Sequence, residues 1–298
     1  MHGVLAGHHQ PGIIARRALR LGALVTLAIL LAACTATRLA YNQAPALSYW
    51  WIDRHVDLTD TQTAQTREDL KAFFQWHRRQ ELPVYASLLR QWQTMAVDQV
   101  SPAQACAQFE DIRQRLERAA AETVEPFARL ALQLTPDQLE NLKKQQAESN
   151  EEFEKDFLRG SPERRLNKRL DKAVDRSESF YGKLSPAQRD LLRDWLQQSP
   201  FDPQRTQAER LRRQADLLQT IRDAQATPAK AEQLVREHIA RIRQSPEPGY
   251  NAYNQALVRQ GCAQFAMLHN ATTPEQRANA VRVLKGYEDD LRTLSAQR

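Results

Sequence analysis

The sequence has little glycine and no segment with the alternating Val, Ile and Thr residues that predict β-strands. Nine of its 298 residues are glycine, and only Gly160, Gly182, Gly249, Gly261 and Gly286 lie beyond residue 33. Gln, Arg, Leu, Ala and Glu are plentiful instead, and these residues favour helices. The sequence therefore predicts an all-α fold.

Motifs that identify common catalytic and metal sites are also missing. The sequence contains no His-Glu-x-x-His or Cys-x-x-Cys spacing for zinc, no Gly-x-Ser-x-Gly nucleophile motif and no glycine-rich phosphate loop. Acidic residues are abundant, but no feature selects a pair of carboxylates for acid–base catalysis. We therefore expect a protein that is not an enzyme and that needs no metal and no cofactor.

One uncharged apolar segment, residues 21–31, is preceded by Arg16, Arg17 and Arg20 and followed by small residues. This order is typical of a secretory signal. Its end, Leu31-Ala32-Ala33-Cys34, resembles the lipobox of bacterial lipoproteins, whose signal peptidase cuts before the lipidated cysteine. We expect residues 1–33 to be removed and the mature chain to start at Cys34. The alternative is an uncleaved transmembrane anchor, which needs about 20 apolar residues.

Lipidation of Cys34 would place the mature chain in the cell envelope, because more than one acyl chain gives stable membrane anchoring. Thr35 stands where inner-membrane lipoproteins commonly have Asp, which favours the inner leaflet of the outer membrane, facing the periplasm. Removal of the signal peptide lowers the formal net charge from +6 to about +3. This small charge does not favour nucleic-acid binding. The expected partners are the membrane, through Cys34, and envelope proteins or anionic lipid.

A helix-start motif recurs along the chain. In this motif, Ser or Thr is followed three residues later by Gln, usually with Pro directly after the Ser or Thr. It occurs at residues 58–62, 100–104, 134–138, 184–188 and 272–276. Residues 226–230 are a degenerate copy without the Gln. Ser or Thr caps a helix, Pro fits its first position, and Gln completes a capping box. With breaks at Pro83 and at residues 160–162, 199–203 and 245–249, we expect an irregular bundle of about nine or ten helices. The expected organisation is a signal peptide at 1–33, a lipid-anchored segment at 34–57 and a helical domain at 58–298.

Four of the five tryptophans lie between residues 50 and 92. One interpretation is an aromatic core where the first helices pack, which predicts that Trp50 and Trp51 are at least partly buried. The other is a belt at the lipid surface, formed by the aromatic residues nearest the anchor: Tyr41, Tyr49, Trp50 and Trp51. In that case Tyr41 is the residue most expected to face the headgroups. We favour the core.

A basic segment contains an excess of positive charge: Arg159, Arg164, Arg165, Lys168, Arg169 and Lys172. It could bind anionic lipid, lipopolysaccharide or an acidic protein segment. The alternative, which we favour, is a solvated helix face with i,i+4 ion pairs. Of the histidines, His238 falls on an apolar stripe with Leu234 and Val235 and is expected to be packed in the interior.

If Cys34 is acylated, Cys106 and Cys262 are the remaining thiols. The envelope is oxidising, and each cysteine is followed by Ala-Gln-Phe, so we predict a disulfide between them. The alternative is two separately buried cysteines, since free cysteine is often buried.

Residues 38–45, 49–51 and 76–83 together resemble an uncharacterised family of proteobacterial lipoproteins, catalogued as a domain of unknown function. The resemblance extends over nearly the whole mature chain. It implies a helical envelope lipoprotein and no particular activity. The Leu-Thr-x-x-Gln starts are also similar to those of Spy-type periplasmic chaperones, which are far shorter and richer in methionine; here only Met95 and Met267 follow the signal.

The leading expectation is therefore an envelope lipoprotein that acts as a binding or scaffold protein. A chaperone-like holder of unfolded proteins is the second hypothesis, and a hydrolase of envelope polymers is the third. An exposed concave apolar surface would favour the chaperone. A buried polar pocket with clustered carboxylates or histidines would favour the hydrolase, and a closed bundle would favour the scaffold.

Overall fold

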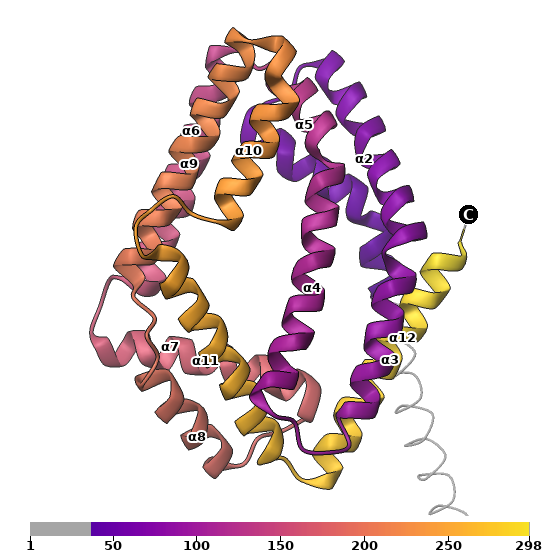
Figure 1. Ribbon diagram of the computed structural model, residues 1–298, viewed down its shortest axis with the longest axis vertical. Helices are drawn as coiled ribbons and strands as arrows, with labels where there is room; N and C mark the ends of the chain where they lie inside the picture. The colour runs from indigo at the N-terminus through magenta and orange to yellow at the C-terminus, as the bar shows by residue number, and fades with distance from the viewer. Residues whose placement is uncertain (1–36, 298) are drawn as a thin grey trace, which may run out of the picture. The chain divides into compact units, whose positions relative to one another are not determined.

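The computed structural model describes residues 37–297, and helices account for nearly all of them (Figure 1). No strand occurs among these residues, so the predicted all-α fold is confirmed. Cys34 lies outside the described residues. No helix between residues 37 and 297 has the length and apolar character needed to cross a membrane.

A helix over residues 37–56 is followed by eleven α-helices and one short 3₁₀ helix. These are α2 (Asp60–Gln80), α3 (Leu82–Met95), α4 (Pro102–Glu122), α5 (Val124–Ala131), α6 (Pro136–Phe157), α7 (Pro162–Tyr181), α8 (Pro186–Gln197), α9 (Pro203–Ala226), η1 (Pro228–Lys230), α10 (Ala231–Arg243), α11 (Tyr250–Asn270) and α12 (Pro274–Ala296). The count is slightly higher than the nine or ten helices predicted from the sequence.

The recurring motif marks helix starts, as predicted. In five copies the Ser or Thr side chain accepts a hydrogen bond from the backbone of the Gln three residues later, and that Gln side chain accepts one from the cap backbone; the caps are Thr59, Ser101, Thr135, Ser185 and Thr273. The degenerate copy at Thr227 has no side-chain cap and begins only the short η1. The missing Gln therefore coincides with the one copy of the motif that does not start an α-helix directly.

Two breaks raise the helix count, and proline lies just beyond each. Glu81 separates α2 from α3, with Pro83 in the first turn of α3. Thr123 separates α4 from α5, and Pro126 follows three residues later. Proline donates no backbone hydrogen bond and its ring clashes with the carbonyl four residues back, so it ends a helix at this distance. The break at Pro83 was expected, whereas the one before Pro126 was not.

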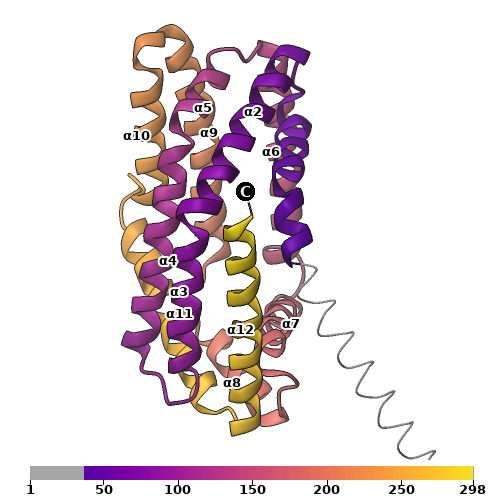
Figure 2. The same cartoon turned by 90° about the vertical axis from the view of Figure 1, so that its right-hand side faces the viewer.

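The chain divides into two compact units, Met1–Gln43 and Ala44–Arg298. In the described part of the first unit, residues 37–43 are helical. Within the second unit, α3 runs beside α12 and α4 beside α11 (Figure 1 and Figure 2). α9 packs against α6 and α10, α10 also packs against α5, and α7 packs against α8 and α12.

The described residues of the second unit form several hydrophobic clusters. One contains Ile221 and joins the end of the 37–56 helix to α5, α6 and α9. Leu192 lies in a second, formed by α7, α8, α11 and α12, and Val235 in a third, formed by α5, α9 and α10. The fourth is small and surrounds Cys262 between α4 and α11.

Candidate binding surfaces

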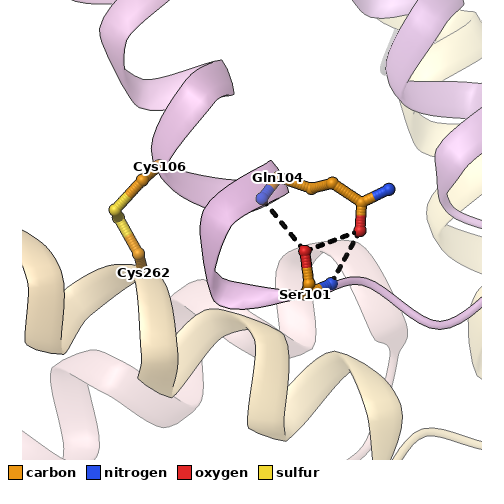
Figure 3. The surroundings of a disulfide bond; sticks show 4 residues. All are labelled: Ser101, Gln104, Cys106 and Cys262. Atoms are coloured by element: carbon orange, nitrogen blue, oxygen red, sulfur yellow. Dashed lines mark hydrogen bonds between the residues drawn. A yellow bond between two sulfur atoms is a disulfide. The ribbon is translucent and has the colours of Figure 1, made fainter.

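The two cysteines predicted to pair are joined. The sulfur atoms of Cys106 in α4 and Cys262 in α11 lie 2.07 Å apart, and their Cα atoms 5.2 Å apart (Figure 3). Nearby, the side chain of Asn270 accepts from the backbone N–H of Val100 (2.8 Å) and donates to its carbonyl oxygen (3.0 Å). The disulfide prediction is confirmed, and together these contacts fix the start of α4 to α11.

The aromatic residues near the N-terminus do not all pack in the core. Trp50 and Trp51 each expose 57% of their surface, so the expectation that they belong to an aromatic core is wrong. Tyr49 is half-buried, its hydroxyl lies 3.2 Å from the Thr63 hydroxyl, and the guanidinium of Arg67 lies 3.8 Å from its ring centre. Neighbouring positions on one helix therefore face opposite sides: Tyr49 contacts α2, whereas the tryptophans point outward.

The remaining aromatic residues of this part of the chain are partly covered. Trp76 and Trp92 are half-buried, as an aromatic core requires. Trp92 donates its indole N–H to the side chain of Gln108, so its polar atom is satisfied within the fold. Tyr41, the residue most expected to face headgroups if the aromatic residues form a lipid-surface belt, is half-buried.

The six basic residues of the segment 159–172 are largely engaged within the protein. Lys168 and Lys172 both donate to Asp156 at the end of α6, and these hydrogen bonds hold the pKa of the Asp156 carboxyl below its usual value. The guanidinium of Arg169 lies over the ring of Phe201, 4.8 Å from its centre. These contacts run between elements rather than along one helix face as i,i+4 pairs.

The three other basic residues of this segment lie at the turn between α6 and α7. Arg159 pairs with Glu154 (3.0 Å), and Arg165 donates to the carbonyl oxygen of Gly160 (2.6 Å). Arg164 is exposed in the first turn of α7. An anionic partner would have to compete with the internal contacts for most of this charge, so its binding here stays a prediction.

Two buried histidines are held by hydrogen bonds inside the fold. His269 is 1% exposed, and its Nδ1 lies 2.9 Å from the Tyr181 hydroxyl and its Nε2 2.8 Å from the Asp98 carbonyl oxygen. Since a carbonyl only accepts, Nε2 carries the hydrogen and Nδ1 accepts from Tyr181. Burial lowers the pKa of His269 and raises the pKa of Tyr181 to about 12. His238 is buried, as expected, with Nδ1 2.7 Å from the Asp216 carboxylate.

A polar cleft of about 530 Å³ runs along α9 and α10. Its charged lining residues are Arg212, Asp216, Arg222, Arg241 and Glu247. Two of the arginines are already paired, because Arg241 donates to Asp216 (2.8 Å) and Arg212 to the buried Glu209 (2.8 Å). Burial acts to raise the pKa of Glu209, but hydrogen bonds from arginines and Ser245 outweigh it and lower the pKa to about 2. Glu209 is thereby held ionised, so it lacks the proton that a general acid must donate.

A fully buried carboxylate, Glu81, lies at the junction of α2 and α3 with no exposed surface. Its oxygens lie 3.2 Å from Arg118 Nε and 3.7 Å from an Arg115 nitrogen, yet neither accepts a hydrogen bond within the described part of the chain. Burial raises the pKa of Tyr85, and the charge of Glu81 adds to the rise. Burial also lowers the pKa of His77, against the opposing effect of Glu81.

An apolar pocket of about 220 Å³ opens between α3, α4 and α12. Its lining is Tyr85, Leu88, Leu89 and Trp92 from α3, Ile112 from α4, and Tyr287 and Leu291 from α12. Phe109 and Leu116 lie three and four residues from Ile112, on the same side of α4, and are 49% and 61% exposed. A cavity of about 150 Å³ holds a benzene molecule, so this pocket has room for one apolar group of that size or somewhat larger.

Sequence reasoning missed this pocket and the buried carboxylates Glu81 and Glu209. Glu81 directly precedes Leu82-Pro83 and so could have been recognised as a residue at a helix junction. Glu209 lies within a long charged helix and carries no local signal. Among residues 37–297, no three His, Cys, Asp or Glu side chains gather as a potential metal site.

A family model, described as a family of unknown function (DUF6279), matches residues 54–241. The match includes α2 to α9 and most of α10, and it contains Trp76, Glu81 and Cys106. It begins after residues 38–51, so the N-terminal part of the resemblance noted in the sequence lies outside it. No curated protein and no solved structure matches the chain.

Proposed function

We propose that this chain, which belongs to the family of unknown function DUF6279, is an outer-membrane lipoprotein that faces the periplasm and acts by binding rather than by catalysis. The observation that carries the proposal is Leu31-Ala32-Ala33-Cys34, placed directly after an uncharged apolar segment with arginines before it. The disulfide between Cys106 and Cys262 supports an oxidising compartment, because such bonds are rare in the cytosol.

Fatty-acid labelling tests the anchor. Wild-type cells grown with labelled palmitate should yield a labelled protein whose mature N-terminus is Cys34. Cys34→Ala should give an unlabelled precursor, whereas the control Cys106→Ala/Cys262→Ala should be labelled and cleaved normally. Labelling of the Cys34→Ala protein, or an unlabelled wild type, would exclude a lipoprotein.

Density-gradient separation of the membranes tests the location. The wild-type protein should sediment with the outer membrane. Thr35→Asp should move it to the inner membrane, because Asp after the acylated cysteine commonly retains lipoproteins there. If the wild-type protein is found in the inner membrane instead, the proposed location is wrong while the anchor stands.

The binding role is supported by the apolar pocket between α3, α4 and α12 and by the exposed Phe109 and Leu116 beside it. A photo-crosslinking amino acid at Leu116 should capture an envelope protein in living cells. The same amino acid at Glu152, an exposed position on α6, is the matched control and should not. Equal capture at both positions, or none at Leu116, would contradict a partner at this surface.

The pocket also favours a second candidate, a chaperone-like holder, because an exposed apolar surface can bind unfolding proteins. The two roles differ in the partners captured: a scaffold gives one discrete crosslinked species, and a chaperone gives many. A chaperone should also suppress the aggregation of an unrelated reduced protein, and Phe109→Ser/Leu116→Ser should weaken this effect. No suppression by the wild-type protein would leave the scaffold role alone.

A further inference from the structure

The part of the 37–56 helix that belongs to the second unit is apolar on two opposite sides. Tyr49, Ile52 and Val56 form the inner side: Tyr49 contacts α2, and Ile52 and Val56 join the hydrophobic cluster of α5, α6 and α9. The spacing i, i+3, i+7 places these three residues on one helix face. This side accounts for how the helix is held to the domain.

The outer side consists of Leu47, Trp50 and Trp51, which expose 59%, 57% and 57% of their surface. Arg54 continues the same face, with its guanidinium 5.8 Å from the ring centre of Trp50. Residues 44–52 contain no charged side chain. A helix that is apolar all round is normally covered on all sides. The outer side therefore has the composition of a covered surface but is exposed in the described part of the chain.

We propose that this outer side lies on the lipid headgroup region of the membrane that holds Cys34. The inference rests on the proposed lipid anchor and adds an orientation to it: this segment lies along the membrane surface rather than standing away from it. Tryptophan suits this position, because its large apolar ring and its single N–H donor favour the boundary between acyl chains and water. Arg54 adds a positive charge that anionic headgroups would attract.

The length of chain between the anchor and the tryptophans permits this contact. Trp50 lies sixteen residues after Cys34, so even a fully extended chain keeps the tryptophans within about 55 Å of the membrane-bound cysteine. Within that reach, a lipid surface is the one partner that the anchor itself supplies at high local concentration.

Vesicle binding by the unlipidated mature chain tests the inference. The complete mature chain with Cys34→Ser, exported behind a non-lipoprotein signal, is mixed with vesicles of phosphatidylethanolamine and phosphatidylglycerol. It should sediment with the vesicles, and brominated lipid should quench its tryptophan fluorescence. Leu47→Ser/Trp50→Ser/Trp51→Ser in the same chain should lower the partition coefficient about tenfold or more, with an unchanged far-UV circular dichroism spectrum.

The matched control is Val97→Ser/Leu211→Ser, which removes apolar groups that are 56% and 46% exposed, one just after α3 and one on α9, and should leave vesicle binding unchanged. No binding by the parent chain, equal binding by the triple variant, or an equal loss in the control would overturn the inference. A parent chain that is dimeric and a triple variant that is monomeric without vesicles would also overturn it, because a second copy would then cover this side. Fatty-acid labelling reports the anchor separately, so failure of one proposal is distinguishable from failure of the other.

Discussion

Gln62 and Gln138 exchange hydrogen bonds through their side-chain amides, although they start different helices 76 residues apart. The Nε2 of Gln62 donates to Gln138 Oε1 (3.2 Å), and the Nε2 of Gln138 donates to Gln62 Oε1 (2.7 Å). Each Nε2 also donates to a backbone carbonyl of the other helix start, at Gln133 and Asp57 respectively. Both side chains are buried, so their polar atoms are satisfied by one another and by the backbone.

The same arrangement occurs between α8 and α12. Gln188 and Gln276 donate to each other's Oε1 at 2.7 and 3.0 Å, and to the carbonyl oxygens of Ala271 and Lys183. In both pairs the carbonyl lies five residues before the partner glutamine. The recurring motif therefore does more than cap single helices: in two places it pairs two helix starts through one repeated geometry.

Gln138→Ala should destabilise the protein by about 1–3 kcal/mol, because it removes two hydrogen bonds of the buried Gln62 amide and the one donated to the Asp57 carbonyl, and it weakens the cap. The control is Gln104→Ala, which removes the same capping box at α4 but an exposed side chain, and should cost at most about 1 kcal/mol. Urea unfolding of the two variants provides the comparison. Equal losses would show that Gln138 contributes only as a cap.

The helix starts could be predicted from the sequence because capping is local. Ser or Thr, Pro and Gln at fixed spacing satisfy the first backbone N–H groups whatever lies around them. The glutamine pairs could not be predicted, since they depend on which two helix starts meet in space. The disulfide could be predicted for a different reason: if Cys34 is lipidated, only Cys106 and Cys262 remain to pair, whatever the fold.

The tryptophans show where sequence reasoning stops. Trp50 and Trp51 carry the same apolar signal as Ile52 and Val56, and periodicity does not distinguish a helix side buried by protein from an exposed one. The burial of Glu81 was not predicted, for the opposite reason. A charged residue is expected at the surface, but the tertiary packing of α2, α3 and α4 encloses it with two arginines.

Reduction of the Cys106–Cys262 disulfide should destabilise the protein by about 2–4 kcal/mol, because the bond closes a long loop and restricts the unfolded chain. Urea unfolding with and without dithiothreitol measures the loss, and thiol titration of the oxidised, denatured protein should find no free thiol at these positions. Cys106→Ala/Cys262→Ala should be as unstable as the reduced protein and should not respond to dithiothreitol. Two titratable thiols would contradict the pairing.

His269 should make the protein less stable at mildly acidic pH. Its pKa in the folded state is lowered by burial from the unfolded value of 6.5, so the unfolded chain binds the proton more readily. Its contribution to stability is therefore complete above pH 6.5 and is lost as the pH falls through the folded pKa. The carboxylates Glu209 and Glu288, with pKa values lowered to about 2, act only in a more acidic range.

Urea midpoints between pH 7.5 and 5 measure this effect, and NMR titration of the histidine ring gives the pKa directly. His269→Gln can still accept from Tyr181 and donate to the Asp98 carbonyl, so it should fold and show a weaker pH dependence between pH 5 and 7. A measured pKa of 6.5 or higher for His269 would contradict the expectation.

At the α2–α3 junction, removing the two arginines that pair with the buried Glu81 should destabilise the protein more than removing the Glu81 carboxylate. Arg115→Met/Arg118→Met leaves a charge with no exposed surface uncompensated and should cost about 3–5 kcal/mol. Glu81→Gln removes that charge and leaves two arginines whose side chains still reach solvent, so it should cost less, about 1–2 kcal/mol. The control is Arg113→Met, an exposed ion pair on the same helix, which should cost at most about 1 kcal/mol. Urea unfolding of the three variants measures these losses. A larger loss for Glu81→Gln than for the double variant would show that the carboxylate does not depend on its two arginines.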